Sequence, residues 1–379
     1  MVKHCPHSAR LIYASSERSA DLLYATGFRV PDAVVWLEDN GKTRLILNPL
    51  EIDRGRRQAR VDQITAQDEI ESAWRQEHRF SKTPPASQWL PYHLKSLNIE
   101  VVDVPADFPL EMAHALDADG INVRVLNPFF PQREIKSGKE IQAIIQAQRQ
   151  AEAGLTRGTE ILSSARISKQ GILRWGGATL TSERLRFEID QAVRRAGGEP
   201  AHTIVAGGEQ ACDPHEQGHG PLHAGELIIL DIFPHDSSSG YFGDLTRTLL
   251  KGTPSPAQKK LVATVRRGQK KALDSIHAGV DGALLQDAIR LFFSGQGYPT
   301  EKREGRWTGF FHGLGHGVGL EIHESPRIAA GPLKENQVVT VEPGLYIPGL
   351  GGVRLEDLVV VGKDSCRNLT RAPFSWVIP

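Results

Sequence analysis

The feature that most constrains this sequence is the position of acidic residues beside its most apolar segments. Asp231 follows the apolar run LIIL, Glu342 follows VVTV, and Glu356 stands just before LVVV. Such runs predict buried strands. An ionised carboxylate beside a buried strand is costly unless it is paired or binds a metal. The chain must therefore supply compensating positive charge at these strand ends.

Metal ions are the partners that we expect for these carboxylates. Arg247 and Arg354 are the only cations in the strand-end segments, which contain Asp244 as a further acid. Together with the imidazole of His316, the acids form a donor set that suits manganese, cobalt, iron or zinc better than copper(I) or calcium. Shared carboxylates suit two ions about 3.5 Å apart.

Each acid has an ordinary alternative when it is considered alone. An aspartate after a strand is usually a turn or cap residue, and Glu356-Asp357 alone is typical of a solvated loop. The combination favours a metal site, because four nearby glycines allow the backbone to approach closely. These glycines are Gly313, Gly315, Gly317 and Gly319.

The order of apolar runs and turns predicts two domains of α/β (α+β) type. A hairpin is expected across Asp39 to Gly41, and NPFFPQR, followed by a Ser137/Glu140 capping box, marks a boundary near residue 130. We expect a small domain over 1–130 and a catalytic domain over 131–379. Predicted strands are 33–38, 43–48, 99–104, 123–126, 227–233, 338–342 and 358–361; helices should follow Ser137, Thr181, Ser255 and Asp281.

Composition narrows the class of partner. Lys plus Arg and Asp plus Glu both number 45, so no broad field favours nucleic acid or an anionic membrane. The sequence contains neither a secretory signal nor an apolar stretch of the roughly 18 residues that a membrane span needs. Three scattered cysteines fit a reducing compartment. We expect a cytoplasmic protein without nucleic-acid or membrane partners.

Four segments resemble the pita-bread metallopeptidases, the family of methionine aminopeptidase, Xaa-Pro aminopeptidase and prolidase. They are DPHEQGHGPLH, LDIFPHDSSSGYFGDLTRT, FFHGLGHGVGLEIHESP and TVEPGLYIPGLGGVRLEDLVVV, and the resemblance spans about residues 133–379. It implies a creatinase-like N-terminal domain before a pita-bread catalytic domain. It also implies five metal ligands, with Asp244 and Glu356 bridging the ions: Asp231, Asp244, His316, Glu342 and Glu356.

The resemblance also implies catalytic roles. His323, seven residues after His316, matches the family's catalytic histidine, and His215 matches a histidine on the substrate side. Glu342 is expected to act as general acid and base. A hydroxide that bridges the two ions would attack the scissile carbonyl.

Three further residues are candidates for substrate binding, each with an alternative role. His312 either lines the pocket or supports the ligands from behind. Arg354 either pairs with a metal-bound carboxylate or binds a substrate carboxylate. Tyr346 either lines the pocket or packs in the core. His219 stands where proline-specific members of the family often have asparagine.

The segment VEPGLYIPGLGGVRLED and the preceding small domain resemble the Xaa-Pro branch in particular. We expect an Xaa-Pro aminopeptidase that acts on short peptides with proline in second position. The alternatives are an Xaa-Pro dipeptidase (prolidase), a hydrolase of non-peptide amides and an inactive binding protein on the same fold. We expect two divalent ions, Mn²⁺ before Co²⁺, Zn²⁺ or Fe²⁺, and a homodimer.

Overall fold

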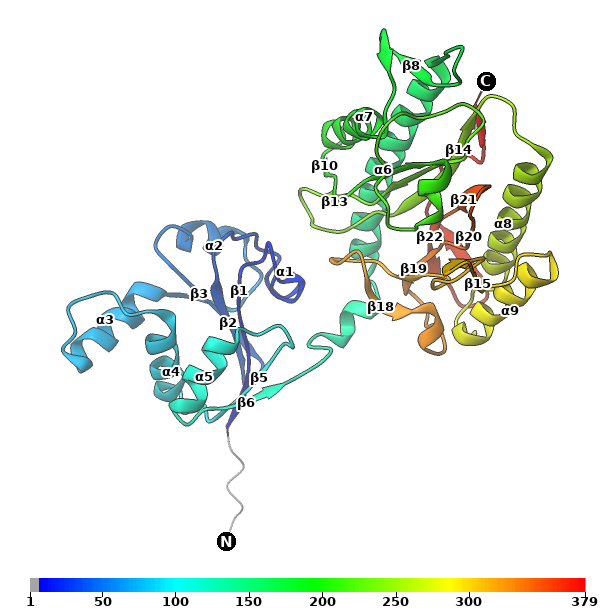
Figure 1. The fold of residues 1–379 in the computed structure, drawn as a ribbon. Helices are drawn as coiled ribbons and strands as arrows, with labels where there is room; N and C mark the ends of the chain where they lie inside the picture. The colour runs from blue at the N-terminus through cyan, green and yellow to red at the C-terminus, as the bar shows by residue number, and fades with distance from the viewer. Residues whose placement is uncertain (1–6, 379) are drawn as a thin grey trace. The chain divides into compact units, whose positions relative to one another are not determined.

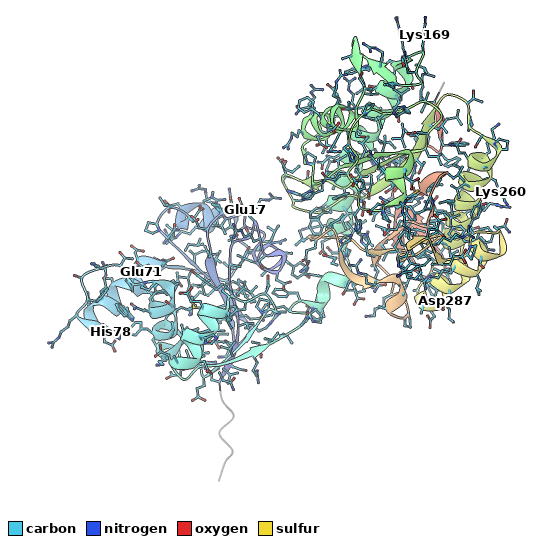
Figure 2. The ribbon with its side chains drawn as sticks, in the orientation of Figure 1. Glu17, Glu71, His78, Lys169, Lys260 and Asp287 are labelled. Carbon is cyan, nitrogen blue, oxygen red and sulfur yellow. The ribbon has the colours of Figure 1, made fainter. Side chains whose placement is uncertain are left out.

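The computed structural model describes residues 7–378. The chain divides into two compact units, Met1–Arg133 and Glu134–Pro379 (Figure 1). Charged side chains such as Lys260 and Asp287 lie on the outside of the second unit (Figure 2). None of the helices within residues 7–378 combines the length and the apolar character needed to cross a membrane.

The N-terminal unit is built on a six-stranded sheet in the order β4-β3-β2-β1-β5-β6. Its strands are β1 (Ser8–Ala14), β2 (Val34–Asp39), β3 (Lys42–Leu47), β4 (Gln63–Ala66), β5 (Val101–Val104) and β6 (Asn122–Val125). The pairs β1–β2 and β2–β3 are antiparallel, and the other three pairs are parallel. Asn40 and Gly41 join β2 to β3 with positive φ angles of 49° and 74°, as tight hairpin turns require. The predicted hairpin is confirmed.

Both faces of this sheet are buried. Val35 and Leu37 of β2 point into one core, whereas Val34 and Trp36 point into another, because successive side chains of a strand alternate between faces. Helices cover both cores (Figure 1). They are α1 (Ala20–Thr26), α2 (Ile52–Gln58), α3 (Gln67–His78), α4 (Ala86–Ser96) and α5 (Leu110–Ala118).

The second unit contains two larger sheets, in the orders β11-β12-β14-β24 and β18-β17-β19-β22-β23. Their strands are β11 (Ile204–Gly207), β12 (Ile228–Ile232), β14 (Leu245–Lys251), β24 (Val377–Ile378), β17 (His316–Gly317), β18 (Glu324–Arg327), β19 (Val338–Val341), β22 (Asp357–Val361) and β23 (Cys366–Asn368). The first sheet has mixed connectivity, because β14 pairs with β24 in parallel and with β12 antiparallel. One smaller sheet contains three strands, β7 (Arg166–Ile167), β8 (Leu173–Trp175) and β9 (Ala178–Thr179). The others are two-stranded: β10 (Gly198–Glu199) with β13 (His235–Asp236); β15 (Glu301–Arg303) with β16 (Arg306–Thr308); and β20 (Gly344–Ile347) with β21 (Gly351–Arg354).

A pair of helices covers each larger sheet. Helices α6 (Gly138–Ser164) and α7 (Ser182–Arg195) share one core with β12 and β14, and α8 (Pro256–Ser275) and α9 (Gly282–Gly295) share another with β19 and β22. Short 3₁₀ turns are η1 (Pro131–Glu134), η2 (Gly208–Cys212) and η3 (Ile328–Ala330). The sheets meet where the amide of Glu356, just before β22, donates to the carbonyl of Thr246 in β14 over 3.1 Å. The predicted acids therefore lie at the junction of two sheets.

The expected helix starts are confirmed by their caps. Ser137 and Ser255 each form a capping box, and Thr181 and Asp281 accept hydrogen bonds from first-turn amides. Strand β12 confirms the strand predicted over 227–233, and Asp231 lies inside this strand rather than at its end. The polar side chain is tolerated there because it faces a cavity.

Candidate metal centre and active-site cavity

One cavity of about 820 Å³ in the second unit is lined by all five predicted metal ligands. The predicted residues His215, His312, His323 and Arg354 line the same cavity. This volume lies within the range of about 300–1,000 Å³ typical of small-molecule sites. His219 is exposed and does not line the cavity. Its side chain faces Glu216 instead.

Strand register brings the ligands together. Asp231 of β12 lies opposite Thr246 of β14, so that Asp231 and Asp244, two residues before Thr246, are near each other. In the second sheet, Glu342 directly follows β19 and Glu356 directly precedes β22, which are antiparallel neighbours. Antiparallel pairing places the end of one strand beside the start of the next.

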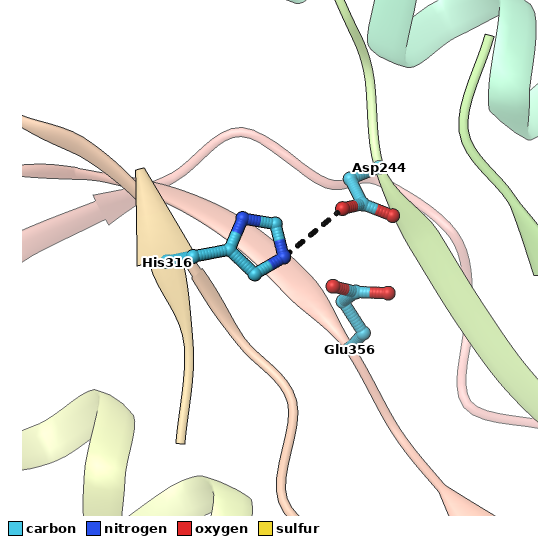
Figure 3. Close-up of side chains that lie close together, drawn as sticks. All are labelled: Asp244, His316 and Glu356. Carbon is cyan, nitrogen blue, oxygen red and sulfur yellow. Dashed lines mark ion pairs between the residues drawn. The ribbon is translucent and has the colours of Figure 1, made fainter. Parts of the chain in front are cut away.

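Asp244, His316 and Glu356 form the tightest group. One donor atom from each lies within 4.8 Å of the others, and His316 Nε2 lies 3.7 Å from Asp244 Oδ2 (Figure 3). The other ring nitrogen of His316, Nδ1, is 3.1 Å from the carbonyl of Gly317 and donates to it. That bond fixes the tautomer in which Nε2 carries a lone pair directed at the acids, as metal-binding histidines require.

Glu342 and Asp231 complete the donor set. Glu342 Oε1 lies 3.4 Å from His316 Nε2 and accepts a hydrogen bond from the Thr340 hydroxyl over 3.3 Å. Asp231 Oδ2 accepts from Arg354 over 2.6 Å. The second oxygen, Oδ1, is buried and has no hydrogen-bond partner among the described residues. A buried carboxylate oxygen without a partner is costly, so Oδ1 is the atom of Asp231 that is available to a cation.

The acids strongly perturb one another. Burial, followed by repulsion from Glu356 and Asp231, raises the pKa of Asp244 well above its usual value. Burial and the charge of Glu342 do the same for Glu356. Burial raises the pKa of Glu342 to about 7, although nearby Arg354 opposes the rise. Each rise reflects burial of the carboxyl group first and repulsion from the neighbouring acids second.

The donor set fits two divalent ions. Of the described cavity-lining residues, four are carboxylates, and Arg327 and Arg354 are the permanent cations. Buried charges are normally balanced by partners or by metals. Four carboxylates with one imidazole match divalent first-row ions, and acids shared between two ions would remove the mutual repulsion.

A hydrogen-bonded chain leads from Asp231 to His312. Arg354 donates to Asp231 and, from Nη1, to the Tyr346 hydroxyl over 3.0 Å. Tyr346 in turn lies 2.8 Å from Nε2 of His312, whose Nδ1 donates to the carbonyl of Gly313 over 2.8 Å. Tyr346 is fully buried and does not line the cavity. Both ring nitrogens of His312 are occupied, and burial lowers its pKa to about 3.

His323 and His215 have exposed side chains at the cavity. The ring of His323 packs edge-on against His316, with 4.4 Å between ring centroids. His215 lies on the loop after η2, which Arg186 holds through the carbonyls of Gln217 and Gly218. Both side chains are exposed at the cavity, where a substrate can reach them.

Three of the four glycines predicted to allow close approach do so. A Cβ on Gly315 would lie 2.0 Å from the carbonyl oxygen of Thr340, and one on Gly317 would lie 2.3 Å from that of Ser325. At Gly319 the obstacle is the Glu324 carboxylate, also at 2.3 Å. The prediction is wrong for Gly313, where the nearest atom is 3.9 Å away.

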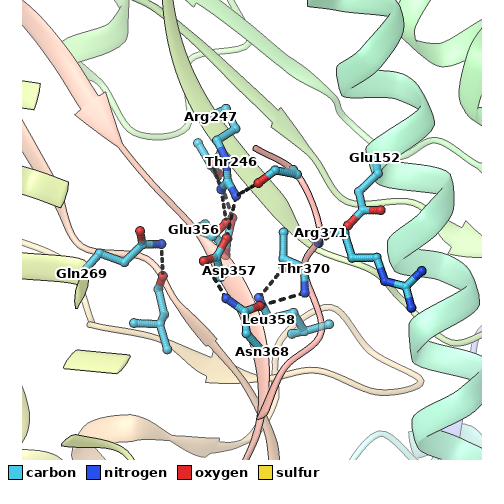
Figure 4. A network of polar contacts seen from close by, with 12 residues as sticks. Glu152, Thr246, Arg247, Gln269, Glu356, Asp357, Leu358, Asn368, Thr370 and Arg371 are labelled. Carbon is cyan, nitrogen blue, oxygen red and sulfur yellow. Dashed lines mark hydrogen bonds and ion pairs between the residues drawn. The ribbon is translucent and has the colours of Figure 1, made fainter. Parts of the chain in front are cut away.

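The contacts of the residues behind the ligands were not predicted, although Arg247 was noted as a nearby cation. The Thr246 hydroxyl donates to Glu356 Oε2 over 2.7 Å, and Arg247 donates to the carbonyl of Glu356 over 2.7 Å and to Asp357 (Figure 4). Thr246 is two residues after Asp244, a spacing that places both on one face of an extended chain. Arg327 was also missed, although it is paired across β17 and β18 with His316.

A buried set of four carboxylates and one imidazole, open to a cleft, is the donor set of a divalent metal site. The family model of metallopeptidase family M24 matches residues 142–363, more than half of the chain. The chain belongs to this family, and the predicted pita-bread, mixed α/β fold is confirmed.

Known relatives include peptidases of two kinds. An Xaa-Pro dipeptidase of Pyrococcus horikoshii is 32% identical over 248 residues, which are 63% of this chain and 63% of the relative. One of Pyrococcus furiosus is 35% identical over 48% of this chain and 52% of the relative. The matches thus span less than two thirds of these curated relatives. The structure of an X-Pro aminopeptidase from Thermotoga maritima is 26% identical, with a TM-score of 0.80 over 98% of both chains.

Proposed function

We propose that this protein is a metal-dependent peptidase that removes the residue before proline from the N-terminus of short peptides. One observation carries the proposal: five metal donors and two exposed histidines converge on a single cavity. The names of the relatives, Xaa-Pro dipeptidase and X-Pro aminopeptidase, support specificity for the bond before proline.

Asp231, Asp244, His316, Glu342 and Glu356 would hold two divalent ions, with manganese the first choice and cobalt, zinc or iron as alternatives. When bound, the ions supply a water of lowered pKa as nucleophile and polarise the scissile carbonyl. Carboxylate and imidazole donors bind several divalent first-row ions, so the donor set does not select one metal.

Glu342 is the residue that we propose to move protons. In the metal-free protein, burial raises the pKa of its carboxyl group to about 7, and a carboxylate beside the attacking water is placed to act as general base. It would take a proton from the attacking water and deliver it to the leaving nitrogen of proline. His323 and His215, exposed at the cavity, would donate hydrogen bonds to the carbonyl oxygen as negative charge develops there.

The engagement of Arg354 favours the aminopeptidase. A dipeptidase needs a cation to bind the substrate's carboxylate, and Arg354 is committed to Asp231, Tyr346 and the carbonyl of Pro214. The dipeptidase is the second candidate for two reasons. Arg327 lines the cavity with an exposed side chain that could bind a substrate carboxylate. The relatives of the chain also include dipeptidases.

Hydrolysis of Xaa-Pro and of Xaa-Pro-Yaa-Zaa by the manganese-loaded protein separates the two candidates. We expect higher kcat/KM on the tetrapeptide, and little change with Arg327→Gln. A strong preference for the dipeptide that Arg327→Gln abolishes would replace the aminopeptidase with the dipeptidase. Activity on non-peptide amides alone would indicate the third alternative.

A second measurement tests the metal-dependent mechanism itself. Elemental analysis should find two ions per chain, and Glu342→Gln should remove peptidase activity. Absence of metal after incubation with manganese would indicate an inactive binding protein. Gel filtration and cell fractionation test the expected homodimer and cytoplasmic location.

A further inference from the structure

A buried ion pair involves Glu324, the residue that follows His323 in the chain. Lys136, two residues before α6, donates from Nζ to Oε1 of Glu324 at the start of β18, and their side chains are 1% and 7% exposed. The two residues are 188 positions apart in sequence. Replacing a buried ion pair with apolar residues often leaves stability unchanged or improved, so such a pair is better explained by the geometry that it imposes.

The Glu324 carboxylate is the centre of the turn that carries His323. Its Oε2 accepts from the amide of Glu321 over 3.4 Å, and the carboxylate packs against Gly319, where any Cβ would lie 2.3 Å from Oε1. The amide of Gly319 also donates to the carbonyl of Glu321 over 3.1 Å. Glu324 pairs with Gly317, next to the ligand His316. The whole turn between the two histidines therefore closes on one carboxylate.

Lys136 is itself fixed. Its amide donates to the carbonyl of Asn336 over 2.9 Å, shortly before β19 and Glu342. The capping box of Ser137 and Glu140 holds the following helix start. Lys136 thus ties the turn that carries His323 to the backbone that leads into the ligand Glu342.

We propose that Lys136 and Glu324 are positioning residues, whose ion pair holds the ring of His323 at the reacting carbonyl. This inference rests on the proposed peptidase function and adds two residues to its machinery. A displacement of about 1 Å at a reacting group costs on the order of 100-fold in rate. The effect should therefore appear in kcat, with the metal ligands left in place.

A double-mutant cycle between Lys136→Met and His323→Ala tests the proposal on the full-length, manganese-loaded protein. We expect Lys136→Met to lower kcat about 10-fold to 100-fold with two ions still bound, and to have almost no further effect once His323 is alanine. Lys136→Arg should restore part of the loss. Lys270→Met, which removes an exposed ion pair with Asp274 on α8, is the matched control and should match the wild type.

Two further outcomes decide the case. Equal losses from Lys136→Met in the presence and absence of the His323 ring would overturn the proposal and indicate a purely structural pair. If Lys136→Met does not fold, the near-isosteric Glu324→Gln takes its place in the same cycle with the same expectations. A wild-type protein that binds metal but cleaves no Xaa-Pro peptide would instead contradict the proposed function.

Discussion

Arg354 donates from Nη2 to Oδ2 of Asp231 over 2.6 Å, while Oδ1 of the same carboxylate is buried without a partner among the described residues. The two oxygens of the Asp231 carboxylate thus have different environments. The guanidinium holds one oxygen and restrains the carboxylate, which leaves the other oxygen without a partner in the cavity wall. Arg354 itself is held by the Tyr346 hydroxyl.

Arg354→Met should therefore lower kcat/KM by about 10-fold to 100-fold, the usual effect of losing a partner that orients a metal ligand. Asp231 would lose its orientation, and Tyr346 would lose its donor. Arg157→Met is the matched control, because Arg157 pairs with Glu188 between α6 and α7, away from the cavity. Equal activity of the two variants would show that Arg354 does not orient Asp231.

Metal binding should release protons, and more of them at low pH. In the metal-free protein, burial raises the pKa of Glu342 to about 7 and places the pKa values of Asp244 and Glu356 well above normal. Metal ligands must be deprotonated, so at pH 6 binding displaces the proton of Glu342, which has largely dissociated at pH 8.5. Titration calorimetry in two buffers of different ionisation enthalpy should show about one or more extra protons released at pH 6.

Glu342→Gln provides the check on this assignment. Glutamine cannot carry the titrating proton, so the number released at pH 6 should fall by about one. A number that is the same at both pH values, or unaffected by this substitution, would mean that the acids are already ionised before the metal arrives.

The parts of the fold and site that were predictable from sequence depend on short-range patterns. The Asn40-Gly41 turn sets the hairpin locally, and caps such as Ser137 mark helix starts wherever they occur. The candidate acids were visible because a charge beside an apolar run is unfavourable without a partner. Asp231 and Glu342 could be selected as candidate ligands without knowledge of the fold.

The partners of those residues were not predictable, because they depend on register between distant strands. Arg354 was equally compatible with a substrate carboxylate and with an acid of the protein, and only its position opposite Asp231, 123 residues away, decides between them. Tyr346 was equally compatible with the cavity wall and the core. Neither the sequence around Lys136 nor the sequence around Glu324 indicates that these two residues form an ion pair.

Gly315→Ala should destabilise the protein severely. The added Cβ would lie 2.0 Å from the carbonyl oxygen of Thr340, so β19 or the His316 segment would have to move. Overpacking of this kind typically costs about 1–3 kcal/mol, and a shift of His316 should also weaken metal binding. Gly313→Ala, two residues away with open space around it, should retain wild-type stability and metal content. Thermal unfolding and elemental analysis of both variants provide the comparison; equal behaviour would contradict the steric argument.

The N-terminal unit should lose stability in mild acid through His93 of α4. Burial, with a smaller effect from Arg44, lowers the pKa of this imidazole to about 4, and Nε2 has no hydrogen-bond partner among the described residues. The ordinary pKa is about 6.5, so between these values the unfolded chain binds a proton that the folded chain excludes. Stability attributable to His93 therefore falls as the pH decreases from 6.5 towards 4.

The loss between pH 7 and pH 5 should be about 2 kcal/mol, since each unit of pKa difference corresponds to about 1.4 kcal/mol. His93→Gln should remove this part of the pH dependence, and the exposed His114 of α5 offers the matched His114→Gln control. Urea unfolding at both pH values, with hydrogen exchange of α4 amides as the probe of this unit, measures the difference. Because the metal site contributes equally to wild type and variant, an identical pH dependence in the two would show that His93 takes up its proton in the folded state.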